Sequence, residues 1–254
     1  MSPPITYRCH QVSRVLLRQF AKDKKVNIFG KDGFRGSNIP ENIGYIREDR
    51  DLYDATEAQW EKVENRFNRM IASVDAGTVL QEPDHIKTAK QLITLHFVRS
   101  IATQKLFDES EEKSFDELAS DLKEQNLDVV DARRKWKADL GKTKLQVITD
   151  TMAKVQKYID QFHLEIGVAA PNTGFILGDN PVINLQLEGP SGVIQGVGIT
   201  ASDVIYLPIS QKYLLSLTKI RENSRYRQLA PEGVRLINKK TKSQTIKEFY
   251  AKPL

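Results

Sequence analysis

Apolar residues recur at alternating spacings of three and four through the middle of the chain, and this pattern constrains the fold more than any other feature. Such spacing places apolar side chains on one face of an α-helix. It predicts helices over residues 56–76, 84–107 and 142–166, with a more polar helix beginning at Ser114. Because each helix must bury its apolar face against another, we predict an antiparallel helical bundle. The core of this bundle is expected to contain Trp60, Phe67, Leu92, Ile148, Met152 and Ile159.

The pattern changes at Gly167, after which glycine and proline recur and the apolar runs shorten to strand length. These runs predict strands at 174–178, 182–187, 204–209 and 213–218. A Gly-Pro-Ser-Gly turn at 189–192 predicts that 182–187 pairs with residues 193–197. The fold class is therefore α+β, in which a central antiparallel helical bundle packs against a small, mostly antiparallel C-terminal sheet.

The two ends of the chain carry shorter patterns. Residues 10–20 have apolar side chains at helical spacing and predict a short amphipathic helix, followed by a strand near Val26 and a long loop over 30–54 with one strand near Tyr45. The closing residues predict a basic helix that buries Val234, Ile237, Ile246 and Phe249. We expect one domain over residues 1–254, made of an N-terminal helix, strand and loop (1–55), the helical bundle (56–166), a β layer (167–230) and a basic C-terminal helix (231–254).

The net charge of +5 is unevenly distributed along the chain. Residues 1–35 carry a charge of +6 and residues 219–254 a charge of +7, which leaves −8 for residues 36–218. Because chain ends commonly lie near each other, one interpretation is that the two basic segments form one positive surface for phosphate or nucleic acid. A solvated basic face is the alternative, and we prefer it because only dense patches of one sign bind usefully.

Composition also bounds the compartment and the cofactors. The single Cys9 cannot form an internal disulfide, which indicates a reducing compartment or no redox role. No apolar run approaches the ~20 residues that span a bilayer, and residues 1–9 lack the apolar core of a signal peptide, so we expect a soluble, cytoplasmic protein without a membrane partner. No glycine-rich phosphate loop, GxGxxG, His-Glu-x-x-His or CxxC motif occurs. Neither a nucleotide cofactor nor a redox cofactor is therefore expected.

The segment from Gly174 to Asn184 is the strongest candidate for a functional site in the sequence. Its apolar residues 175–177 stop abruptly at Asp179 and Asn180, and the following proline keeps Asn180 out of the helical region. Asp179 is therefore expected where a buried strand opens into a turn. An ordinary turn is the alternative explanation, since Asp and Asn favour such corners.

Arg99 lies in a helical segment that is apolar almost all round. An unpaired guanidinium there would lose several kcal/mol on desolvation, so Arg99 is expected to contact a carboxylate or a bound anion. The candidate partners are Asp179 and Glu64, and a purely structural ion pair is the alternative to a catalytic role. His10, at the start of the first predicted helix, is either a proton carrier or a partner of the local backbone.

Residues 10–20, His-Gln-Val-Ser-Arg-Val-Leu-Leu-Arg-Gln-Phe, resemble the N-terminal His-x-Val-Pro-x-x-x-Leu-x-x-Phe signature of an uncharacterised, mainly bacterial family, domain of unknown function 4238. The likeness spans nearly the whole chain and continues at Glu57, Glu64, Arg99, Asp179-Asn180-Pro181-Val182, Leu207-Pro208-Ile209-Ser210 and Asn238. Three departures from the family pattern occur: Ser13 replaces proline, Ser100-Ile101 replaces Thr-Pro, and His96 replaces glutamine.

The resemblance implies no established reaction, but it implies that His10, Arg99, Asp179 and Asn180 belong to one architecture. A histidine, an arginine, carboxylates and a basic rim suit phosphodiester chemistry. The leading hypothesis is a metal-dependent nuclease or phosphodiesterase that acts on nucleic acid or nucleotides, with His10, Arg99 and Asp179 as catalytic residues. Asp179 and Glu64 would hold Mg²⁺ or Mn²⁺. The residues expected to bind the phosphate-bearing ligand are Arg14, Arg18, Asn180, Lys239, Lys240 and Lys242.

The rival hypothesis is a non-catalytic interaction module, such as a regulatory partner or an antitoxin-like binder of another protein. In that case the same polar residues merely fasten the layers of the fold together. The arrangement of His10, Arg99 and Asp179 discriminates between the two hypotheses. One open pocket that contains all three favours the enzyme, whereas separation or burial favours the interaction module.

Overall fold

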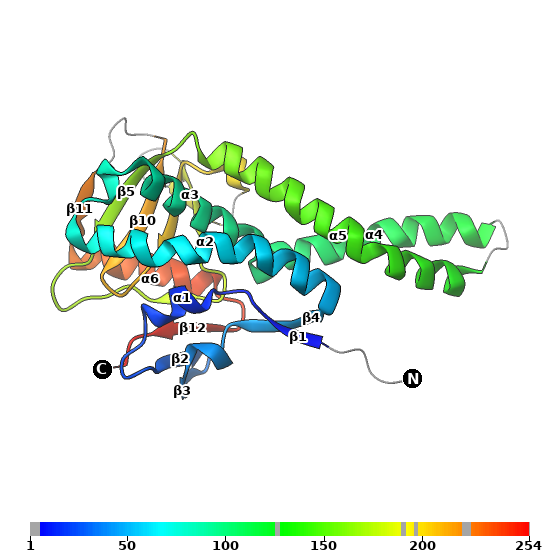
Figure 1. The fold of residues 1–254 in the computed structure, drawn as a ribbon, viewed down its shortest axis with the longest axis horizontal. Helices are drawn as coiled ribbons and strands as arrows, with labels where there is room; N and C mark the ends of the chain where they lie inside the picture. Colours follow the sequence, from blue (N-terminus) through cyan, green and yellow to red (C-terminus); the bar gives the residue numbers. More distant parts are fainter. Residues whose placement is uncertain (1–5, 125–127, 189–191, 196–197, 220–224, 254) are drawn as a thin grey trace.

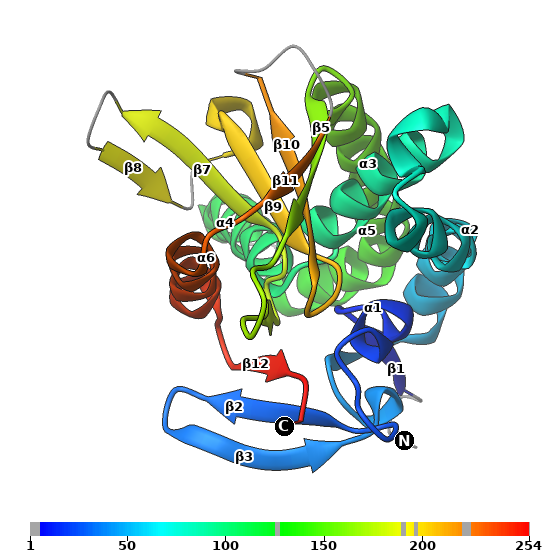
Figure 2. The ribbon, with the colours of Figure 1, turned by 90° about the vertical axis from the view of Figure 1, so that its left-hand side faces the viewer.

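The protein is arranged in layers around a six-stranded sheet (Figures 1 and 2). The computed structural model describes residues 6–124, 128–188, 192–195, 198–219 and 225–253. One face of the sheet is covered by α2 (Arg50–Ala76), α3 (Pro83–Val98) and α5 (Val129–Ile159), and the other face by α6 (Pro231–Gln244). The predicted α+β class, with helices packed on a sheet, is therefore confirmed.

The central sheet has the strand order β11-β5-β10-β9-β7-β8. Its strands are β5 (His163–Val168), β7 (Ile183–Glu188), β8 (Gly192–Gln195), β9 (Val204–Pro208), β10 (Tyr213–Thr218) and β11 (Tyr226–Gln228). All pairs are antiparallel except β11 with β5, so the sheet is mixed and larger than predicted. Every residue of β10 is buried because helices cover both faces. The predicted pairing of 182–187 with 193–197 is confirmed for residues 193–195 by the β7–β8 register, and residues 196 and 197 lie outside the described part of the chain.

A second sheet joins the two ends of the chain. Its order is β3 (Gly33–Asn38), β2 (Val26–Gly30), β12 (Glu248–Ala251), β6 (Leu177–Gly178). The predicted closing helix over 231–254 is wrong beyond Gln244, because Thr245 is extended and the chain then pairs with β2. Phe249 stacks on Phe29 at 5.1 Å between ring centroids instead of lying on a helix. The expected strand at 174–178 is reduced to the two residues of β6.

The N-terminal helix predicted over 10–20 is also shorter than expected. His10 is the last residue of β1 (Thr6–His10) and pairs with Tyr45 in β4 (Tyr45–Asp49). The backbone N–H groups of Gln11 and Val12 then donate to the Gly44 carbonyl at 2.8 and 3.2 Å, which turns the chain before α1 (Arg14–Arg18) begins. The 3₁₀ turn η1 (Pro40–Asn42) precedes β4, so the expected loop over 30–54 contains two strands, β3 and β4, and the start of α2.

The predicted helix over 84–107 is divided in two. α3 ends at Val98 and α4 runs over Ile101–Glu124. Ser100 caps the second helix, because its Oγ accepts the Thr103 N–H at 3.2 Å. The helix expected to begin at Ser114 is the second half of α4, and α5 begins after Asp128, whose carboxylate accepts the N–H groups of two first-turn residues. Two further 3₁₀ turns, η2 (Val79–Gln81) and η3 (Ile199–Ala201), complete the connections.

The helical core was well predicted by periodicity. Trp60, Phe67, Leu92, Ile148 and Ile159 are buried, and Met152 is half-buried and packs against the same cluster. The predicted helix over 142–166 nevertheless ends at Ile159, since the chain crosses into β5. No helix in the described part of the chain is both long and apolar enough to cross a membrane.

Candidate functional site

Arg99 is the centre of a polar cluster inside the helical layer. It follows the last turn of α3, and its side chain is only 1% exposed. Nη1 donates to Glu64 Oε1 at 2.7 Å and Nη2 to Glu57 Oε1 at 3.2 Å, while the guanidinium lies 4.3 Å from the centroid of the Trp60 ring. Glu57, Trp60 and Glu64 are spaced three and four residues apart, which places them on one face of α2. Below, the Arg99 cluster means Arg99, Glu57, Trp60, Glu64 and His10.

The predicted partners of Arg99 are therefore half right. Glu64 is confirmed as a partner, and Asp179 is wrong. The sequence pattern correctly required a counter-charge for an arginine in an apolar segment. Glu57 supplies a second carboxylate that the sequence indicated only through the family resemblance, because a Glu on a half-exposed helix face has no distinctive local signal.

His10 lies beside this cluster at the end of β1. Burial, together with the nearby Arg99 and Arg14 guanidinium groups, lowers the pKa of His10 to about 4. The ring hydrogen-bonds to the backbone of Glu41, and its buried Nε2 has no partner among the described residues. His10 is therefore a neutral imidazole at physiological pH, with one lone pair free to accept a proton or a hydrogen bond.

Glu57 has the opposite character. Burial raises the pKa of its carboxyl, the Arg99 guanidinium opposes that shift, and the neighbouring Glu64 adds to it. The Glu57 side chain is 24% exposed, and its Oε1 lies 4.0 Å from Cys9 Sγ. A proton acceptor and a carboxyl of raised pKa thus lie around Arg99, but each guanidinium Nη that would meet a substrate is already bound to a carboxylate.

Asp179 has a different set of partners. Its Oδ1 accepts the Ile246 N–H at 2.9 Å, and its Oδ2 accepts the N–H groups of Lys247 and Glu248 at 2.6 and 3.1 Å. The residue is 3% exposed. Asp179 therefore links the start of β12 to the turn after β6. Charge-assisted hydrogen bonds from three backbone N–H groups to its carboxylate stabilise this contact, so the residue has a structural role.

A small cavity of about 40 Å³ lies between Asp179 and the N-terminal strands, lined also by Gln11, Tyr45 and Ile101. The Tyr45 ring in turn contacts the His10 ring, with centroids 5.9 Å apart. The structure thus brings His10 and Arg99 together and places Asp179 nearby, with all of its described partners elsewhere. None of the cavities that the described residues line contains Asp179 together with His10 and Arg99.

The predicted metal ligands do not form a site in the described part of the chain. Glu64 binds Arg99, and both oxygens of Asp179 accept backbone N–H groups. Among the described residues, no three His, Cys, Asp or Glu side chains come close enough together to hold a metal ion. The Mg²⁺ or Mn²⁺ of the sequence hypothesis stays a prediction.

The predicted phosphate-binding residues are spread over the surface. Arg14 is exposed near His10, and Arg18 pairs with Glu41 at 2.8 Å. Asn180 is half-buried beside Asp179, and on α6 Lys239 is exposed and Lys240 half-buried. Lys242 Nζ lies 5.1 Å from the Phe249 ring centroid. The basic chain ends do meet, since β12 pairs with β2, but whether they bind phosphate stays a prediction.

A comparison with known families tests the resemblance directly. The family model described as "Protein of unknown function (DUF4238)" matches residues 8–253. The chain belongs to the DUF4238 family. Neither the curated proteins nor the solved structures gave a match. DUF4238 membership confirms the predicted resemblance and indicates no activity.

Two of the departures from the DUF4238 pattern contact each other. The Ser13 N–H donates to His96 Nε2 at 3.3 Å, and Nδ1–H of the same ring donates to the Leu92 carbonyl at 2.9 Å. A proline at position 13 has no N–H, so the His96 acceptor would lose this donor. Burial lowers the pKa of His96 to about 3, which keeps the ring neutral and able to accept.

Proposed function

We propose that this DUF4238 protein is a non-catalytic interaction module that binds another protein. The observation that supports this most is the use of the charged groups nominated for catalysis. Arg99 binds Glu57 and Glu64, and Asp179 binds three backbone N–H groups. Both charged groups are therefore used in contacts that stabilise the fold. Both side chains are buried, which favours the interaction module by the criterion of the sequence analysis.

The outer part of the α4–α5 hairpin is the element best suited to contact a partner. Figure 1 shows these two helices extending well beyond the sheet and the other helices. We call residues 108–124 and 128–144 the arm. Phe115 is buried in the arm and meets Trp136 edge-on at 5.9 Å, but Val130 is 80% exposed and Leu118 36% exposed. A partner that covers Val130 and Leu118 would remove their apolar surface from water, which stabilises the complex.

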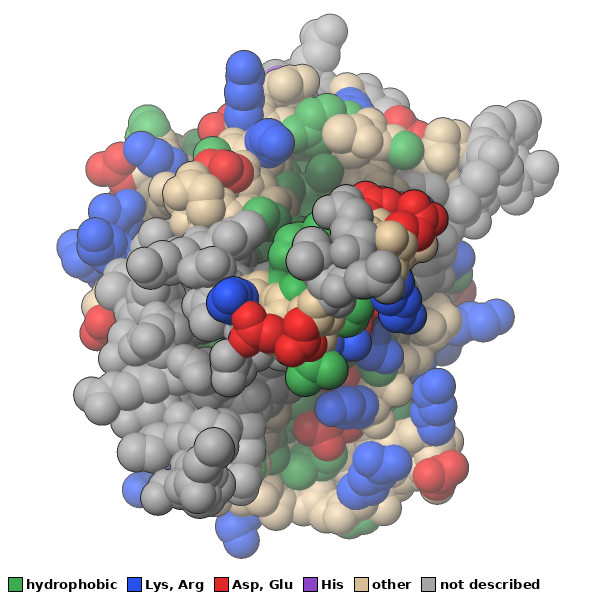
Figure 3. All heavy atoms as spheres, turned by 90° about the vertical axis from the view of Figure 1, so that its right-hand side faces the viewer, with side chains coloured by type: hydrophobic (Ala, Val, Ile, Leu, Met, Phe, Trp, Pro, Cys, Tyr) green, Lys and Arg blue, Asp and Glu red, His purple; other side chains and the backbone are tan. Residues whose placement is uncertain are grey.

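The arm also carries segregated charge. Residues 108–124 of α4 have a net charge of −6, and residues 129–144 of α5 have +4. Arg133 pairs with Glu112 across the hairpin, so part of this charge is matched within the arm. Seen end-on from the side of the arm, acidic side chains gather near the middle of the face with basic side chains around them (Figure 3). A partner protein with complementary acidic and basic patches would fit the arm.

Site-specific photo-crosslinking tests this proposal. A photoreactive residue would replace Val130 on the arm or, as a matched exposed control, Leu236 on α6, which is 57% exposed. We expect a discrete crosslinked partner from position 130 and none from position 236 when the protein is expressed in its source cells. Equal crosslinking from both positions, or none from the arm, would contradict the proposal.

An activity assay provides the complementary test. Wild-type protein, Arg99→Lys and Asp179→Asn would be incubated with Mn²⁺ and with labelled single-stranded and duplex nucleic acid. No cleavage by the wild type is expected. Metal-dependent cleavage that both variants lose would overturn the interaction module and restore the nuclease hypothesis.

A further inference from the structure

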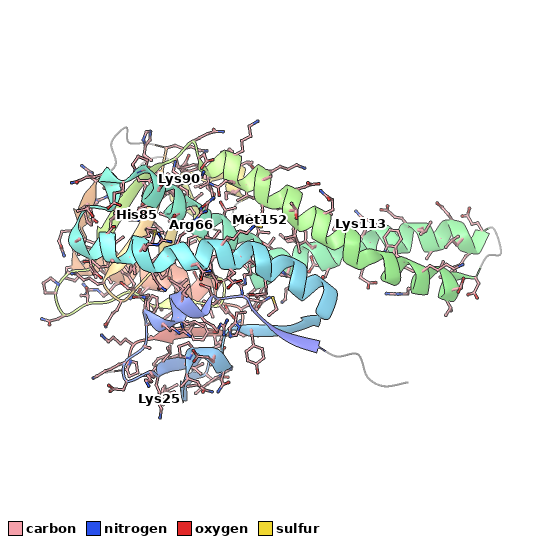
Figure 4. All side chains as sticks on the ribbon, viewed as in Figure 1. Lys25, Arg66, His85, Lys90, Lys113 and Met152 are labelled. Atoms are coloured by element: carbon pink, nitrogen blue, oxygen red, sulfur yellow. The ribbon has the colours of Figure 1, made fainter. Side chains whose placement is uncertain are left out.

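A hollow between α2 and the start of α3, at the end of α3 away from the Arg99 cluster, has the properties of an anion-binding site. It has a volume of about 360 Å³ and is lined by Arg66 and Arg69 from α2 and by Asp84, His85, Lys87 and Thr88 from α3. Figure 4 labels Arg66 and His85, which lie next to each other where the two helices meet. The Arg99 cluster lies at the other end of α3, so this hollow is separate from it.

The cations of this hollow are not engaged elsewhere. Arg66, Arg69 and Lys87 are exposed, and none of them forms an ion pair with another described residue. Asp84 is the only acidic residue among the described residues of the lining, and the His85 ring lies 3.0 Å from Glu82, which is outside the lining. The charges of Arg66, Arg69, Lys87 and Asp84 in the lining sum to +2. α3 begins at Pro83, so the positive end of its helix dipole adds to this potential.

We propose that this hollow binds the dianionic phosphate of a small phosphate monoester. Arg66 and Arg69 are three residues apart on one helix, so their guanidinium groups project in neighbouring directions and are able to donate to one phosphate. Lys87 supplies a third charge from the facing helix. The net charge of the lining matches a dianion, and the volume matches a small ligand.

Asp84 refines the class of ligand. A carboxylate in the wall repels a second phosphate group but accepts a hydrogen bond from a hydroxyl or an amino group. The ligand therefore carries one terminal phosphate and a nearby hydrogen-bond donor, as a phosphorylated sugar or a nucleoside monophosphate does.

A small molecule fits these observations better than nucleic acid does. Binding along a polynucleotide requires a stripe of cations that follows several phosphates, whereas this lining offers three cations around one hollow. The surrounding segment, residues 36–218, also has a net charge of −8, which disfavours a long polyanion.

Calorimetric titration of the full chain at physiological salt tests the proposal. The probes are inorganic phosphate, glucose 6-phosphate and adenosine monophosphate, with glucose and adenosine as the uncharged counterparts. We expect at least one monoester to bind at one site per chain, and its uncharged counterpart not to bind.

Two double variants locate the site. Arg66→Gln with Arg69→Gln removes two charges from the hollow, and Arg227→Gln with Lys154→Gln removes two exposed charges from elsewhere. We expect the first pair to weaken monoester binding roughly tenfold or more and the control pair to change it by less than about twofold.

Three results would overturn the proposal. The first is that none of the monoesters binds. The second is that the two double variants weaken binding equally, which means that overall charge alone attracts the ligand. The third is that a labelled oligonucleotide binds with a steep loss of affinity as salt rises while the monoesters do not, which assigns the surface to nucleic acid.

Discussion

The two ends of the α2–α3 pair use arginine in opposite ways. At one end, Arg99 is 1% exposed and bound to Glu57 and Glu64. At the other end, Arg66 and Arg69 are exposed around a hollow and bind no described carboxylate. The difference shows that burial and pairing decide what an arginine does. A buried, paired guanidinium stabilises the fold, and an exposed, unpaired one is free to meet a ligand.

The largest effect is expected for Arg99→Ala. Removing the guanidinium leaves two partly buried carboxylates close together without their counter-charge, which should lower the free energy of unfolding by about 3–5 kcal/mol. Arg66→Ala, on the same helix pair, should change it by less than about 0.5 kcal/mol. Urea denaturation of both variants measures the contrast, and equal losses would show that the two ends do not differ as described.

The pH dependence of stability should also arise from residues near Arg99, chiefly His96. Below pH 6.5 the unfolded chain binds a proton at His96, whereas the folded protein does not until about pH 3. The unfolded state therefore binds more protons in this window, and the free energy of unfolding falls as pH is lowered, by about 1.4 kcal/mol per pH unit for this residue. His10, with its pKa of about 4, acts in the same direction, and the raised pKa of Glu57 opposes it just above pH 4.5.

His96→Gln isolates this contribution. The variant should reduce the slope of the free energy of unfolding against pH, and the reduction should total about 2 kcal/mol between pH 6.5 and 4.5. Urea denaturation at several pH values is the measurement, and His85→Gln at the other end of α3 is the control. The interpretation fails if both variants change the slope equally.

A smaller effect is expected for Asp179→Asn. The amide keeps one oxygen acceptor but places an NH₂ group against backbone N–H donors, which should destabilise the protein by about 1–3 kcal/mol. Asp203→Asn is the matched control, because Asp203 accepts a single described N–H, from Leu187 at 2.9 Å. Thermal melting with and without Mn²⁺ checks both variants. Stabilisation by Mn²⁺ in the wild type that only Asp179→Asn abolishes would favour a metal site instead.

Much of the helical layer was predictable from local pattern. Trp60, Phe67 and Leu92 were correctly placed in the core because apolar spacing reports directly on which helix face is buried. The ion pair between Glu64 and Arg99 was predictable for a similar reason, since a buried charge needs a partner.

The errors arose where distant pairing overrode local pattern. Phe162 and Ile166 continue the helical spacing of α5, but Ile166 also fits the alternation of a strand and pairs with Leu215 in β10. His10 lies in a strand because it pairs with Tyr45 in β4. Phe249 lies in a strand because it pairs with Phe29 in β2. The hollow between α2 and α3 was not predicted, because exposed basic residues on two separate helices have no distinctive spacing.

The position of β12 has a consequence for how the chain is made. This strand lies between β2 and β6, and its first residue, Glu248, and the two residues before it donate the three N–H groups that bind Asp179. During synthesis, β2 and β6 leave the ribosome long before residues 248–251 exist, so their facing edges remain open until then. A chain that stops short of Ile246 lacks all three donors of the buried Asp179 and leaves two strand edges exposed, which are the features that aggregation and quality-control proteases act on. The nascent protein can therefore complete this sheet only after residues 248–251 have been translated and have left the ribosome.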